Sequence, residues 1–563
     1  MKPESGSDPT DYEQRRRRHA ALELPCTMMN VPLRVTDAMR RAELLFPDQG
    51  IVSRLGPGEI ERRSYADIGA EARQLAAGLR HLGIRPGMRV ATLMWNHGRH
   101  LAAYYAVPAI GAVLHPLNPR LGLDDLAYIV ADAGDTALLI DGDLLPLLEQ
   151  LEAHVRIPHV VVNPRPGHEA RSGQHPWQAV LEAAPVPLDW PTDACDENTP
   201  VSICYTSGTT GRPKGVVYSH RSILLHGLAC ALPDAFGLSG RDTLLTLTPM
   251  FHVNGWSVPY SAVMLGARQV FTGPHARSTD VLDMIQGEGV TAAFGIPTFW
   301  SEVLRALDAD PERWQLPAGL RVYAGGSPPP ADMFRRFDAI GITLQTGWGM
   351  TETSPIAHQT WLRPDTDQLD PDALLRLRTS NGLPLPFIEQ RHVDEDGHPL
   401  AWDDQQLGEL QVRGPWVTRA YLGWPELRPA TTDDGWLRTG DIVKIRADGY
   451  MRLVDRLKDL VKSGGEWISS VELENTLCDH PAVLEAAVIG VPDPTWSERP
   501  LALVALRDGQ HATPESLRQH LQARLPRWMV PERLEIVNSL PRTPVGKLDK
   551  QALRRRYAAS PQP

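Results

Sequence analysis

Apolar residues along most of the chain follow helical and strand periods in turn, and this pattern predicts an alternating α/β fold. One helical face near residue 75 carries only apolar side chains: Ile68, Ala72, Leu75, Leu79 and Leu82. Residues 89–94 then form a short apolar run that is typical of a buried strand. Because such helix and strand patterns repeat through residue 140, we expect a mainly parallel sheet covered by helices on both faces.

The pattern changes twice in the last third of the chain. Residues 385–453 contain short strand-like runs separated by Gly, Pro and Asp, which favours a small β-barrel. A charged segment follows at residues 455–460, and a compact α+β pattern begins after it. The sequence therefore predicts a large N-terminal domain of parallel βα sheets and a small β-barrel at residues 28–454, and a smaller α+β domain at residues 461–563. Residues 1–27 are polar and are expected to form a flexible tail.

Composition and charge exclude several classes of protein. The 563 residues are 42% hydrophobic and 22% charged, which is typical of a globular protein with a large core. The net charge of −11 argues against a general nucleic-acid-binding protein. Five scattered cysteines without a CxxC pair indicate a reducing, cytoplasmic compartment and no zinc site. The longest apolar stretch, residues 101–114, contains Pro108 and Gly111 and is too short to span a membrane.

The strongest chemical signal is a loop rich in glycine and hydroxyl side chains, Tyr205-Thr-Ser-Gly-Thr-Thr-Gly-Arg-Pro-Lys-Gly-Val216. Small residues let backbone N–H groups approach phosphate oxygens, and Lys214 supplies a compact cation. The loop lacks the GxxxxGK-Ser/Thr pattern of a Walker A motif, because Gly215 follows the lysine. We therefore predict a phosphate-binding loop of another type; the alternative is a polar surface hairpin.

Further motifs follow this loop along the chain. They are Thr248-Pro-Met-Phe-His-Val-Asn-Gly-Trp256, Ala324-Gly-Gly-Ser327, Gln345-Thr-Gly-Trp-Gly-Met-Thr-Glu352, Arg438-Thr-Gly-Asp441, Asp455-Arg-Leu-Lys-Asp-Leu460, Lys462-Ser-Gly-Gly-Glu-Trp-Ile468 and Pro541-Arg-Thr-Pro-Val-Gly-Lys547. Together with the loop, they resemble the motifs of the AMP-forming acyl-CoA synthetases, within the adenylate-forming superfamily. The resemblance covers essentially the whole chain after the tail. The motifs that contain Trp256 and Trp467 are similar to those of the medium- and long-chain fatty-acid branch.

The resemblance implies a reaction in which a carboxylate and ATP give an acyl-adenylate and pyrophosphate, after which CoA gives acyl-CoA and AMP. The carboxylate is already ionised at neutral pH, so the site needs cations and Mg²⁺ rather than a general base. By resemblance, Glu352 and Thr209 bind Mg²⁺, Thr351 contacts the α-phosphate, and Lys214 is catalytic. The residues that the resemblance assigns to ATP or AMP are Thr206, Ser207, Gly208, Thr209, Thr210, Gly211, Gly325, Gly326, Gly347, Trp348, Asp441 and Arg456.

Within this set, the resemblance separates an adenine slot from a ribose contact. Gly325, Gly326 and Trp348 correspond to the slot, where Trp348 offers a stacking face; the family more often has Tyr or Phe at that position. Asp441 corresponds to the residue that accepts both ribose hydroxyls, and Arg456 to a second ribose contact. For a carboxylate taken alone, a solvated surface acid is the favoured alternative.

The resemblance also implies that the smaller domain is a mobile lid. Lys547 would bridge the carboxylate and the α-phosphate during adenylation, although lysines near a chain end are usually solvated. Lys458 corresponds to a hinge in the 455–460 linker, about which the lid rotates between the two half-reactions. Gly464, Gly465 and Trp467 would then line the CoA channel; the alternative for either glycine is an ordinary turn.

The acyl pocket should be apolar with one polar end, and its candidates are His252, Trp256 and the run Phe294-Gly-Ile-Pro-Thr-Phe-Trp300, for whose aromatic residues an ordinary core role is the alternative. Trp256 corresponds to a residue that gates the fatty-acid tunnel in long-chain relatives, whereas a hydrogen-bonded core residue is the alternative for His252. The sequence thus predicts an ATP-dependent ligase for a medium- or long-chain fatty acid. The alternatives are an aryl, branched or sulfur-containing short acid, transfer to a carrier protein, a kinase that leaves ADP, or a catalytically silent binding protein.

The predicted partners are the acid, ATP and CoA, with no nucleic acid and no transmembrane segment. A run of four arginines at residues 15–18 leaves a peripheral contact with acidic lipid open, although a solvated arm is favoured. Some long-chain relatives form homodimers, and the sequence leaves a homodimer open as well.

Overall fold

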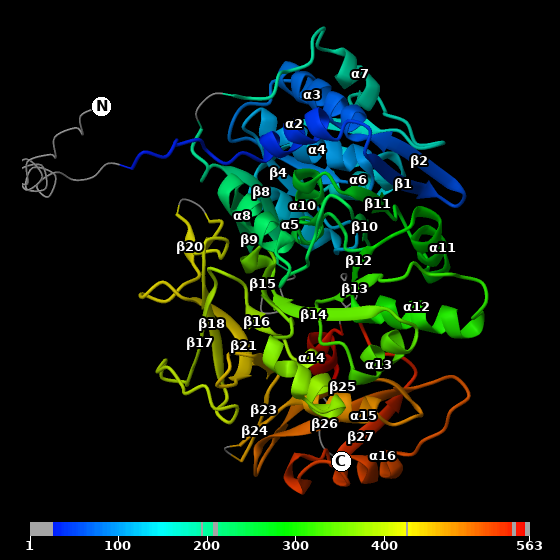
Figure 1. Cartoon of the computed structure of the whole chain (residues 1–563), viewed down its shortest axis with the longest axis vertical. Helices are drawn as coiled ribbons and strands as arrows, with labels where there is room; N and C mark the ends of the chain where they lie inside the picture. The colour runs from blue at the N-terminus through cyan, green and yellow to red at the C-terminus, as the bar shows by residue number, and fades with distance from the viewer. Residues whose placement is uncertain are drawn as a thin grey trace, which may run out of the picture.

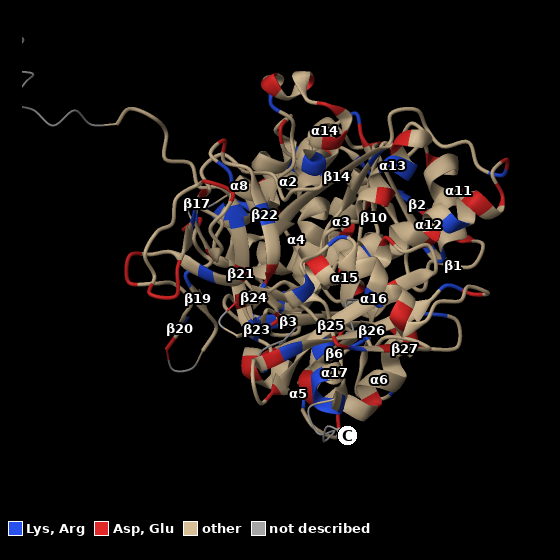
Figure 2. Ribbon diagram, turned by 90° about the horizontal axis from the view of Figure 1, so that it is seen from below, with Lys and Arg blue, Asp and Glu red and all other residues tan. Residues whose placement is uncertain are grey.

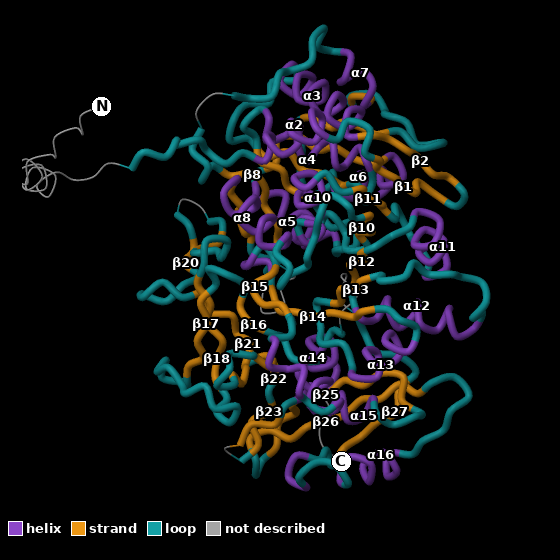
Figure 3. Tube along the Cα trace, in the orientation of Figure 1, coloured by secondary structure: helices purple, strands orange, loops and turns teal. Residues whose placement is uncertain are grey.

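The computed structural model describes residues 26–192, 195–206, 212–423, 426–464, 466–542 and 548–557. Most of the chain forms a large N-terminal domain, and the last part, coloured orange to red in Figure 1, forms a smaller C-terminal domain beside it. The mixed α/β fold with a large and a small domain is therefore confirmed. Helices and strands alternate along the N-terminal domain, as the tube in Figure 3 shows.

The first large sheet has seven strands in the order β7-β6-β5-β3-β4-β8-β9. Its strands are β3 (Arg89–Leu93), β4 (Val113–Pro116), β5 (Asp135–Asp141), β6 (His159–Asn163), β7 (His175–Pro176), β8 (Pro200–Tyr205) and β9 (Gly215–Ser219). All neighbouring strands are parallel except β8 and β9, which form a hairpin around the phosphate-loop motif. The parallel sheet expected around residues 89–140 is confirmed.

Helices cover both faces of this sheet. They are α2 (Val35–Leu45), α3 (Tyr65–His81), α4 (Gly98–Ala109), α5 (Leu123–Ala133), α6 (Leu145–Leu151), α7 (Trp177–Glu182) and α8 (His220–Ala231). The apolar face of α3 packs with α4 and alternate residues of β3 in one core cluster. Helices α5 and α6 pack against the other residues of β3 in a second cluster. The side chains of a strand alternate between faces, so both clusters are built on the same strands.

The second large sheet has nine strands in the order β16-β15-β14-β13-β12-β10-β11-β1-β2. They are β1 (Gly50–Gly56), β2 (Glu59–Ser64), β10 (Thr243–Thr246), β11 (Arg268–Phe271), β12 (Ala292–Gly295), β13 (Arg321–Ala324), β14 (Thr343–Gly349), β15 (Ile356–Gln359) and β16 (Leu383–Pro384). The associated helices are α9 (Val253–Trp256), α10 (Val258–Leu265), α11 (Ser278–Glu288), α12 (Pro297–Ala309), α13 (Ala331–Ala339) and α14 (Pro371–Arg378). Strands β10, β12, β13 and β14 are parallel, so the motifs that follow β10, β13 and β14 meet at one edge of the sheet.

The region expected to form a small β-barrel contains a four-stranded antiparallel sheet in the order β17-β18-β21-β22 and a two-stranded ribbon. The sheet consists of β17 (Glu389–Val393), β18 (Gly408–Arg413), β21 (Leu437–Ile445) and β22 (Met451–Arg456). The ribbon consists of β19 (Ala420–Tyr421) and β20 (Arg428–Pro429).

The C-terminal domain has its own sheet and its own apolar core. Its strands are β23 (Val461–Ser463), β24 (Glu466–Ile468), β25 (Val483–Asp493), β26 (Ser497–Leu506) and β27 (Arg533–Val537), and its helices are α15 (Ser470–Cys478), α16 (Pro514–Gln522) and α17 (Lys550–Tyr557). Ser469 caps α15 by accepting the Glu472 N–H. Thr513 caps α16 in the same way.

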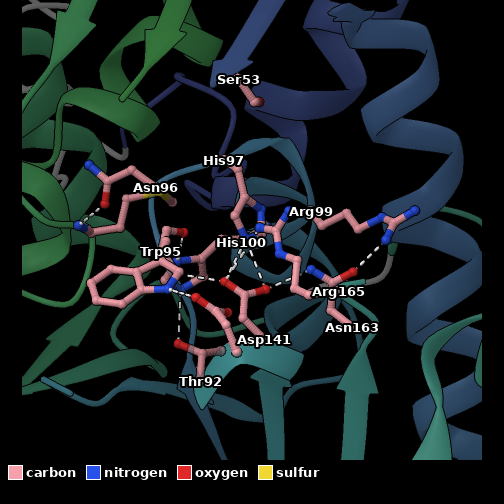
Figure 4. A network of polar contacts seen from close by, with 12 residues as sticks. Ser53, Thr92, Trp95, Asn96, His97, Arg99, His100, Asp141, Asn163 and Arg165 are labelled. Atoms are coloured by element: carbon pink, nitrogen blue, oxygen red, sulfur yellow. Dashed lines mark hydrogen bonds and ion pairs between the residues drawn. The ribbon is translucent and has the colours of Figure 1, made fainter. Parts of the chain in front are cut away.

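A buried polar network lies where β3 and β5 end, between the two large sheets (Figure 4). Asp141 accepts hydrogen bonds from the Trp95 backbone N–H at 2.9 Å, from His97 Nε2 at 2.9 Å and from the Asn163 amide at 2.6 Å. The other ring nitrogen of His97 accepts the His100 backbone N–H and so caps α4. These bonds fix the loop between β3 and α4.

Asn96, in the same loop, reaches across to the second sheet. Its amide group donates to the carbonyl oxygens of Thr246 at 3.1 Å and Thr248 at 2.9 Å, and its Oδ1 accepts the Met250 N–H at 2.7 Å. Tyr104 of α4 adds a hydrogen bond to the Met250 carbonyl at 2.5 Å. Hydrogen bonds from the loop after β3 and from α4 therefore fix the backbone at residues 246–250, just before the turn that carries Trp256.

Acidic and basic residues are interspersed over the surface, as Figure 2 shows for the view from below. Within the described part of the chain, no helix is both long and apolar enough to cross a membrane.

Candidate active site

A cavity of about 490 Å³ lies between the carboxyl ends of β13 and β14, the phosphate-loop hairpin and the small antiparallel sheet. It is lined by all of the described residues that the sequence assigned to a site except Gly464, Trp467 and the acyl-pocket candidates at residues 294–300. These lining residues are Thr206, Lys214, His252, Trp256, Gly325, Gly326, Gly347, Trp348, Thr351, Glu352, Asp441, Arg456 and Lys458. Segments separated by up to 250 residues thus converge on one cavity.

The hairpin of β8 and β9 closes the phosphate loop at its base. The Lys214 N–H donates to Thr206 Oγ1 at 3.1 Å, and the Thr206 N–H donates to the Lys214 carbonyl at 3.0 Å. The Lys214 ammonium lies 4.8 Å from the centre of the Tyr421 ring. Ser207, Gly208, Thr209, Thr210 and Gly211 lie outside the described residues. The described ends of the loop therefore place its lysine at the cavity.

Glu352 follows β14 in a short 3₁₀ turn (Thr351–Thr353) and is buried. Its Oε1 accepts the Tyr421 hydroxyl at 2.7 Å. Burial raises the pKa of Glu352 above its ordinary value, against the opposing effects of the Tyr421 hydroxyl, Arg456 and Lys214. A buried carboxylate beside a phosphate loop is stabilised by added positive charge, and carboxylate and phosphate oxygens are the ligands that Mg²⁺ prefers. The donor set at Glu352 therefore fits a magnesium ion.

Tyrosines that the sequence analysis did not identify brace this turn. Tyr218 of β9 donates its hydroxyl to the Thr351 carbonyl at 2.7 Å. Tyr421 of β19 holds Glu352 and lies under Lys214. Neither tyrosine lies in a recognised motif; Tyr421 lines the cavity, whereas Tyr218 supports the turn from behind through the Thr351 carbonyl.

Asp441 and Arg456 face each other across the antiparallel strands β21 and β22. Arg456 Nε lies 3.3 Å from Asp441 Oδ1, and the Trp348 indole N–H donates to Asp441 Oδ2 at 2.8 Å. Beside Trp348, Gly347 leaves no space for a side chain, because a Cβ there would lie 2.4 Å from the His358 carbonyl oxygen. The three predicted nucleotide residues therefore form one connected group.

Part of the cavity lining is apolar, and this part is called the apolar or acyl end below. It consists of Phe236, Val253, Trp256, Tyr323, Ala324, Pro355 and Ile356. The edge of the Trp256 ring abuts Gly325, where a Cβ would lie 2.8 Å from Trp256 Cη2. His252 is half-buried and lines the same cavity. The residues expected at an acyl pocket thus adjoin those expected at the adenine slot.

Trp256 stands on an unusual backbone turn. Five successive residues have positive φ angles: Val253 (47°), Asn254 (53°), Gly255 (62°), Trp256 (58°) and Ser257 (57°). The Asn254 amide donates to Ser202 Oγ at 3.0 Å, and its Oδ1 accepts the Cys204 thiol at 3.6 Å. Ser257 Oγ donates to the Ser354 carbonyl at 2.9 Å. Strand β8 and the turn after Glu352 therefore hold this left-handed turn in place.

The segment between the domains also reaches the cavity. Strand β22 ends at Arg456 and β23 begins at Val461. Lys458 lines the cavity, and burial lowers its pKa. The Asp455 carboxylate accepts both the backbone N–H and the hydroxyl of Ser470 at 2.6 Å. Asp455, the first residue of the 455–460 segment, thus contacts the first turn of α15 in the small domain.

Two of the residues assigned to the CoA channel, Gly464 and Trp467, do not line the cavity. Gly464 packs under Trp496, and a Cβ at Gly464 would lie 2.6 Å from Trp496 Cε3. Trp467 of β24 lies with its ring 4.1 Å from the Lys462 ammonium. Gly465 and Lys547 lie outside the described residues.

Comparisons with known proteins agree with the geometry. Residues 40–422 match the family described as AMP-binding enzyme, and residues 472–547 match the AMP-binding enzyme C-terminal domain. The chain is 44% identical over 536 residues to a long-chain-fatty-acid–CoA ligase of Thermus thermophilus, which covers 95% of this chain and 97% of that protein. It is 38% identical to a medium-chain-fatty-acid–CoA ligase of Ectopseudomonas oleovorans, over 94% of this chain and 97% of that protein.

Two further matches show the breadth of the relationship. A 3-methylmercaptopropionyl-CoA ligase of Ruegeria pomeroyi is 38% identical over 94% of this chain and 98% of its own. The crystal structure of the anthranilate CoA ligase AuaEII with anthranoyl-AMP superposes with a TM-score of 0.81 at 25% identity, covering 94% of this chain and 98% of that one. The chain therefore belongs to the AMP-binding enzyme family and is an AMP-forming acyl-CoA ligase.

Proposed function

We propose that the chain activates a medium- or long-chain fatty acid with ATP and transfers the acyl group to CoA, releasing pyrophosphate and AMP. One observation carries this proposal: a single cavity is lined both by the polar residues Lys214, Glu352 and Asp441 and by apolar side chains, among them Trp256 and Ile356. An acid with an apolar chain and a polyanionic nucleotide need such a pair of surfaces side by side. The names of the long- and medium-chain relatives support the choice of acid.

In the first half-reaction, a carboxylate oxygen attacks the α-phosphorus while the bond to pyrophosphate breaks. Both reactants are anions, so catalysis depends on positioning and on neutralising charge. We assign Thr206, the glycine- and threonine-rich loop and Lys214 to the β- and γ-phosphates, and Thr351 to the α-phosphate. Glu352, with Thr209 of the loop, would hold the Mg²⁺ that accompanies ATP, which supplies positive charge at the phosphates.

The adenosine part of ATP is assigned to the other predicted residues of the polar end. Gly325, Gly326 and Gly347, which line the cavity, are assigned to adenine, and Trp348 offers a ring face. Asp441 accepts from the ribose hydroxyls, with Arg456 beside it. Support for this assignment is the direct contact of Trp348 and Arg456 with the Asp441 carboxylate.

We also propose that residues 455–460 link a large domain at 28–454 to a lid at 461–563. Lys458 serves as the hinge, and Lys547 reaches the carboxylate and the α-phosphate during adenylation. Gly464, Gly465 and Trp467 then line the CoA channel after the lid rotates. Neither Gly464 nor Trp467 lines the cavity in this structure, and this supports such a rotation, because a channel for the thiol requires them to approach the cavity.

A different acid is the second candidate. The relatives at 38% identity include 3-methylmercaptopropionyl-CoA ligases as well as a medium-chain ligase, and feruloyl-CoA synthases are 34% identical over 88% of this chain. A sulfur-containing short acid or an aryl acid therefore competes with a fatty acid for the apolar end. Transfer of the acyl group to a carrier-protein thiol is the corresponding alternative for the second half-reaction.

A panel of acids decides between these candidates. Purified protein is incubated with ATP, Mg²⁺, CoA and one acid at a time, while released pyrophosphate and the mass of the acyl-CoA are measured. The highest kcat/KM is expected for fatty acids of medium or long chain. A higher value for the sulfur-containing or aryl acid selects the second candidate, and pyrophosphate release without acyl-CoA selects a carrier protein.

The cellular location and the assembly of the protein are separate proposals. Free thiols at all five cysteines support a reducing, cytoplasmic compartment. A homodimer and a peripheral membrane contact are open proposals, to be tested by sedimentation of the protein alone and with anionic vesicles.

A further inference from the structure

The Asp441 carboxylate is held on two sides by side chains from separate elements. Trp348 of β14 donates its indole N–H to Oδ2 at 2.8 Å, and Arg456 of β22 lies with Nε 3.3 Å from Oδ1. Trp348 and Asp441 are each 5% exposed. The Arg456 side chain is 42% exposed, so its contact is open to water. The indole contact is thus the shielded one of the two.

The Trp348 ring is itself fixed by its surroundings. Trp348 pairs with His358 in the register of β14 and β15, and the two rings meet edge to face with centroids 5.3 Å apart. His358 is in turn fixed by a 2.9 Å hydrogen bond from its Nε2 to Gln390 Oε1. An indole has a single N–H donor, in the plane of the ring. A ring held in this way dictates where the carboxylate oxygen must lie.

We propose that Trp348 is a positioning residue for ribose recognition, in addition to facing adenine. Its N–H fixes the plane of the Asp441 carboxylate so that the oxygens face the two ribose hydroxyls, and the enzyme thereby selects ATP over 2′-deoxy-ATP. The proposal rests on the proposed function, in which Asp441 accepts the ribose hydroxyls.

The chemistry of the pair favours this role over simple packing. A hydrogen bond from a neutral donor to an ionised acceptor is stronger and more directional than one between neutral groups. When one partner is removed, the buried oxygen of Asp441 loses its donor and the carboxylate is free to turn toward Arg456 or water. A phenyl ring at position 348 keeps an aromatic face at the cavity but lacks the donor.

Two variants remove the N–H. Trp348→Phe shortens the ring, and replacement of Trp348 by 3-benzothienylalanine keeps the ring size while sulfur takes the place of N–H. With saturating acid, kcat/KM is measured for ATP and for 2′-deoxy-ATP. Both variants are expected to lose about 10-fold in kcat/KM for ATP, as for other hydrogen bonds to charged groups. The loss for 2′-deoxy-ATP is smaller, so the preference for ribose falls, while the KM of the acid is unchanged.

A double-mutant cycle links the effect to Asp441. Trp348→Phe combined with Asp441→Asn is expected to reduce the ribose preference no further than Asp441→Asn alone, because the two residues act through one contact. A variant with weaker ATP use but the wild-type preference for ATP over 2′-deoxy-ATP overturns the proposal and leaves Trp348 a stacking role only. Benzothienylalanine decides the matter when Trp348→Phe does not fold, as judged by circular dichroism.

Failure of this proposal is distinguishable from failure of the proposed function. Wild-type protein that releases no pyrophosphate with any acid contradicts the function, whatever Trp348 does. In that event, calorimetric titration with AMP and 2′-deoxy-AMP still tests the inference. Equal ratios of the two dissociation constants in wild type and variant overturn it, and a smaller ratio in the variant supports it.

Discussion

The two ends of the cavity are built by different means. At the nucleotide end, polar side chains from strands and from the 3₁₀ turn after β14 satisfy one another, as in the 2.8 Å bond from Trp348 to Asp441 and the 2.7 Å bond from Tyr421 to Glu352. At the acyl end, Trp256 stands on five successive left-handed residues, of which only Gly255 is a glycine. The left-handed conformation costs a non-glycine residue about 1–2 kcal/mol, so the surrounding contacts must hold this turn in place.

The difference reflects what each end has to bind. A nucleotide offers charges and hydroxyls at fixed positions, and recognition requires particular donors and acceptors opposite them. An acyl chain offers only apolar surface, and recognition depends on the shape of the pocket. The nucleotide end is therefore defined by residue type, whereas the acyl end is defined by the backbone that places Trp256 against Gly325. Substitutions at the two ends should consequently impair different properties of the protein: catalysis at the nucleotide end, and stability or use of the acid at the acyl end.

The largest expected effect is at the nucleotide end. Glu352→Gln keeps an acceptor for the Tyr421 hydroxyl but removes the negative charge that we assign to Mg²⁺. We expect kcat for pyrophosphate release to fall by about 100-fold or more, as when other groups that stabilise charge in a transition state are removed. The measurement is pyrophosphate release at saturating acid over a range of Mg²⁺ concentrations.

Tyr421→Phe is the matched control for this variant. It removes the hydroxyl that holds Glu352 but keeps the carboxylate and the ring under Lys214. Tyr421→Phe should lower kcat for pyrophosphate release by about 10-fold, which is less than the effect of Glu352→Gln, because a positioning contact is lost rather than a charge. Wild-type turnover by Glu352→Gln would remove Glu352 from the proposed metal site.

The next effect is at the acyl end and concerns stability. Asn254→Ala removes the bonds to Ser202 and Cys204 and puts a less tolerant residue at a φ of 53°. Loss of the buried contacts and added strain should together lower the free energy of unfolding by about 2–3 kcal/mol. Urea titration measures the change. Asn254→Gly is the control, since it loses the same bonds without the strain and should be less destabilised; equal stability of both variants with wild type contradicts this account.

The contrast between the ends also explains what could be predicted from the sequence. The spacing of apolar residues predicted the strand now seen at Arg89–Leu93 and the helix at Tyr65–His81, because these elements depend on local chemistry. The nucleotide residues lie in motifs of polar and glycine residues, and the structure brings Lys214, Glu352 and Asp441 to one cavity. Their roles stay proposals until they are tested.

Other parts of the site depend on contacts that no local pattern encodes. Tyr218 and Tyr421 reach Thr351 and Glu352 only because β9 and β19 lie beside the turn after β14. The positive φ angles of Val253 and Trp256 contradict the usual preferences of both residue types, so tertiary contacts decide them. For the same reason, the sequence does not specify the shape of the acyl pocket or the acid.

A third prediction concerns the contact between the two ends. Gly325→Ala places a methyl group 2.8 Å from Trp256 Cη2, and a ring edge moves less easily than a flexible chain. The ring should be displaced into the acyl end, which lowers kcat/KM for the acid by about 10-fold, in the range of other overpacked sites. The KM of ATP should change by less. Steady-state kinetics with each substrate varied in turn separates the two effects.

Rescue tests whether the ring is the cause. The double variant Gly325→Ala with Trp256→Phe has room for the new methyl group, because the phenyl ring is shorter. It should recover most of the kcat/KM for the acid relative to Gly325→Ala. A double variant that is as slow as the single one, with the KM of ATP raised in both, places the damage at the adenine slot instead.

The smallest effect that we predict is a pH dependence of the free energy of unfolding. It comes from two buried histidines, of which one contacts Ile356 and the other Trp348. Burial lowers the pKa of His226 to about 3 and that of His358 to about 4. Both are neutral in the folded protein, while an unfolded histidine has a pKa near 6.5 and binds a proton below it. The unfolded state therefore binds more protons between pH 6.5 and pH 3–4, and stability falls as the pH is lowered through this window.

His226 allows the sharper test, because its Nε2 accepts the backbone N–H of Ile356, which lines the acyl end, at 3.2 Å. His226→Gln keeps an acceptor but has no proton to gain. Each buried histidine contributes at most about 1.4 kcal/mol per pH unit in this window, so the urea midpoint of wild type should fall more steeply from pH 6.5 to pH 4 than that of His226→Gln. Equal pH dependence of the two urea midpoints would mean that folded protein takes up a proton at His226 without losing stability. That outcome would contradict the tight packing inferred around His226.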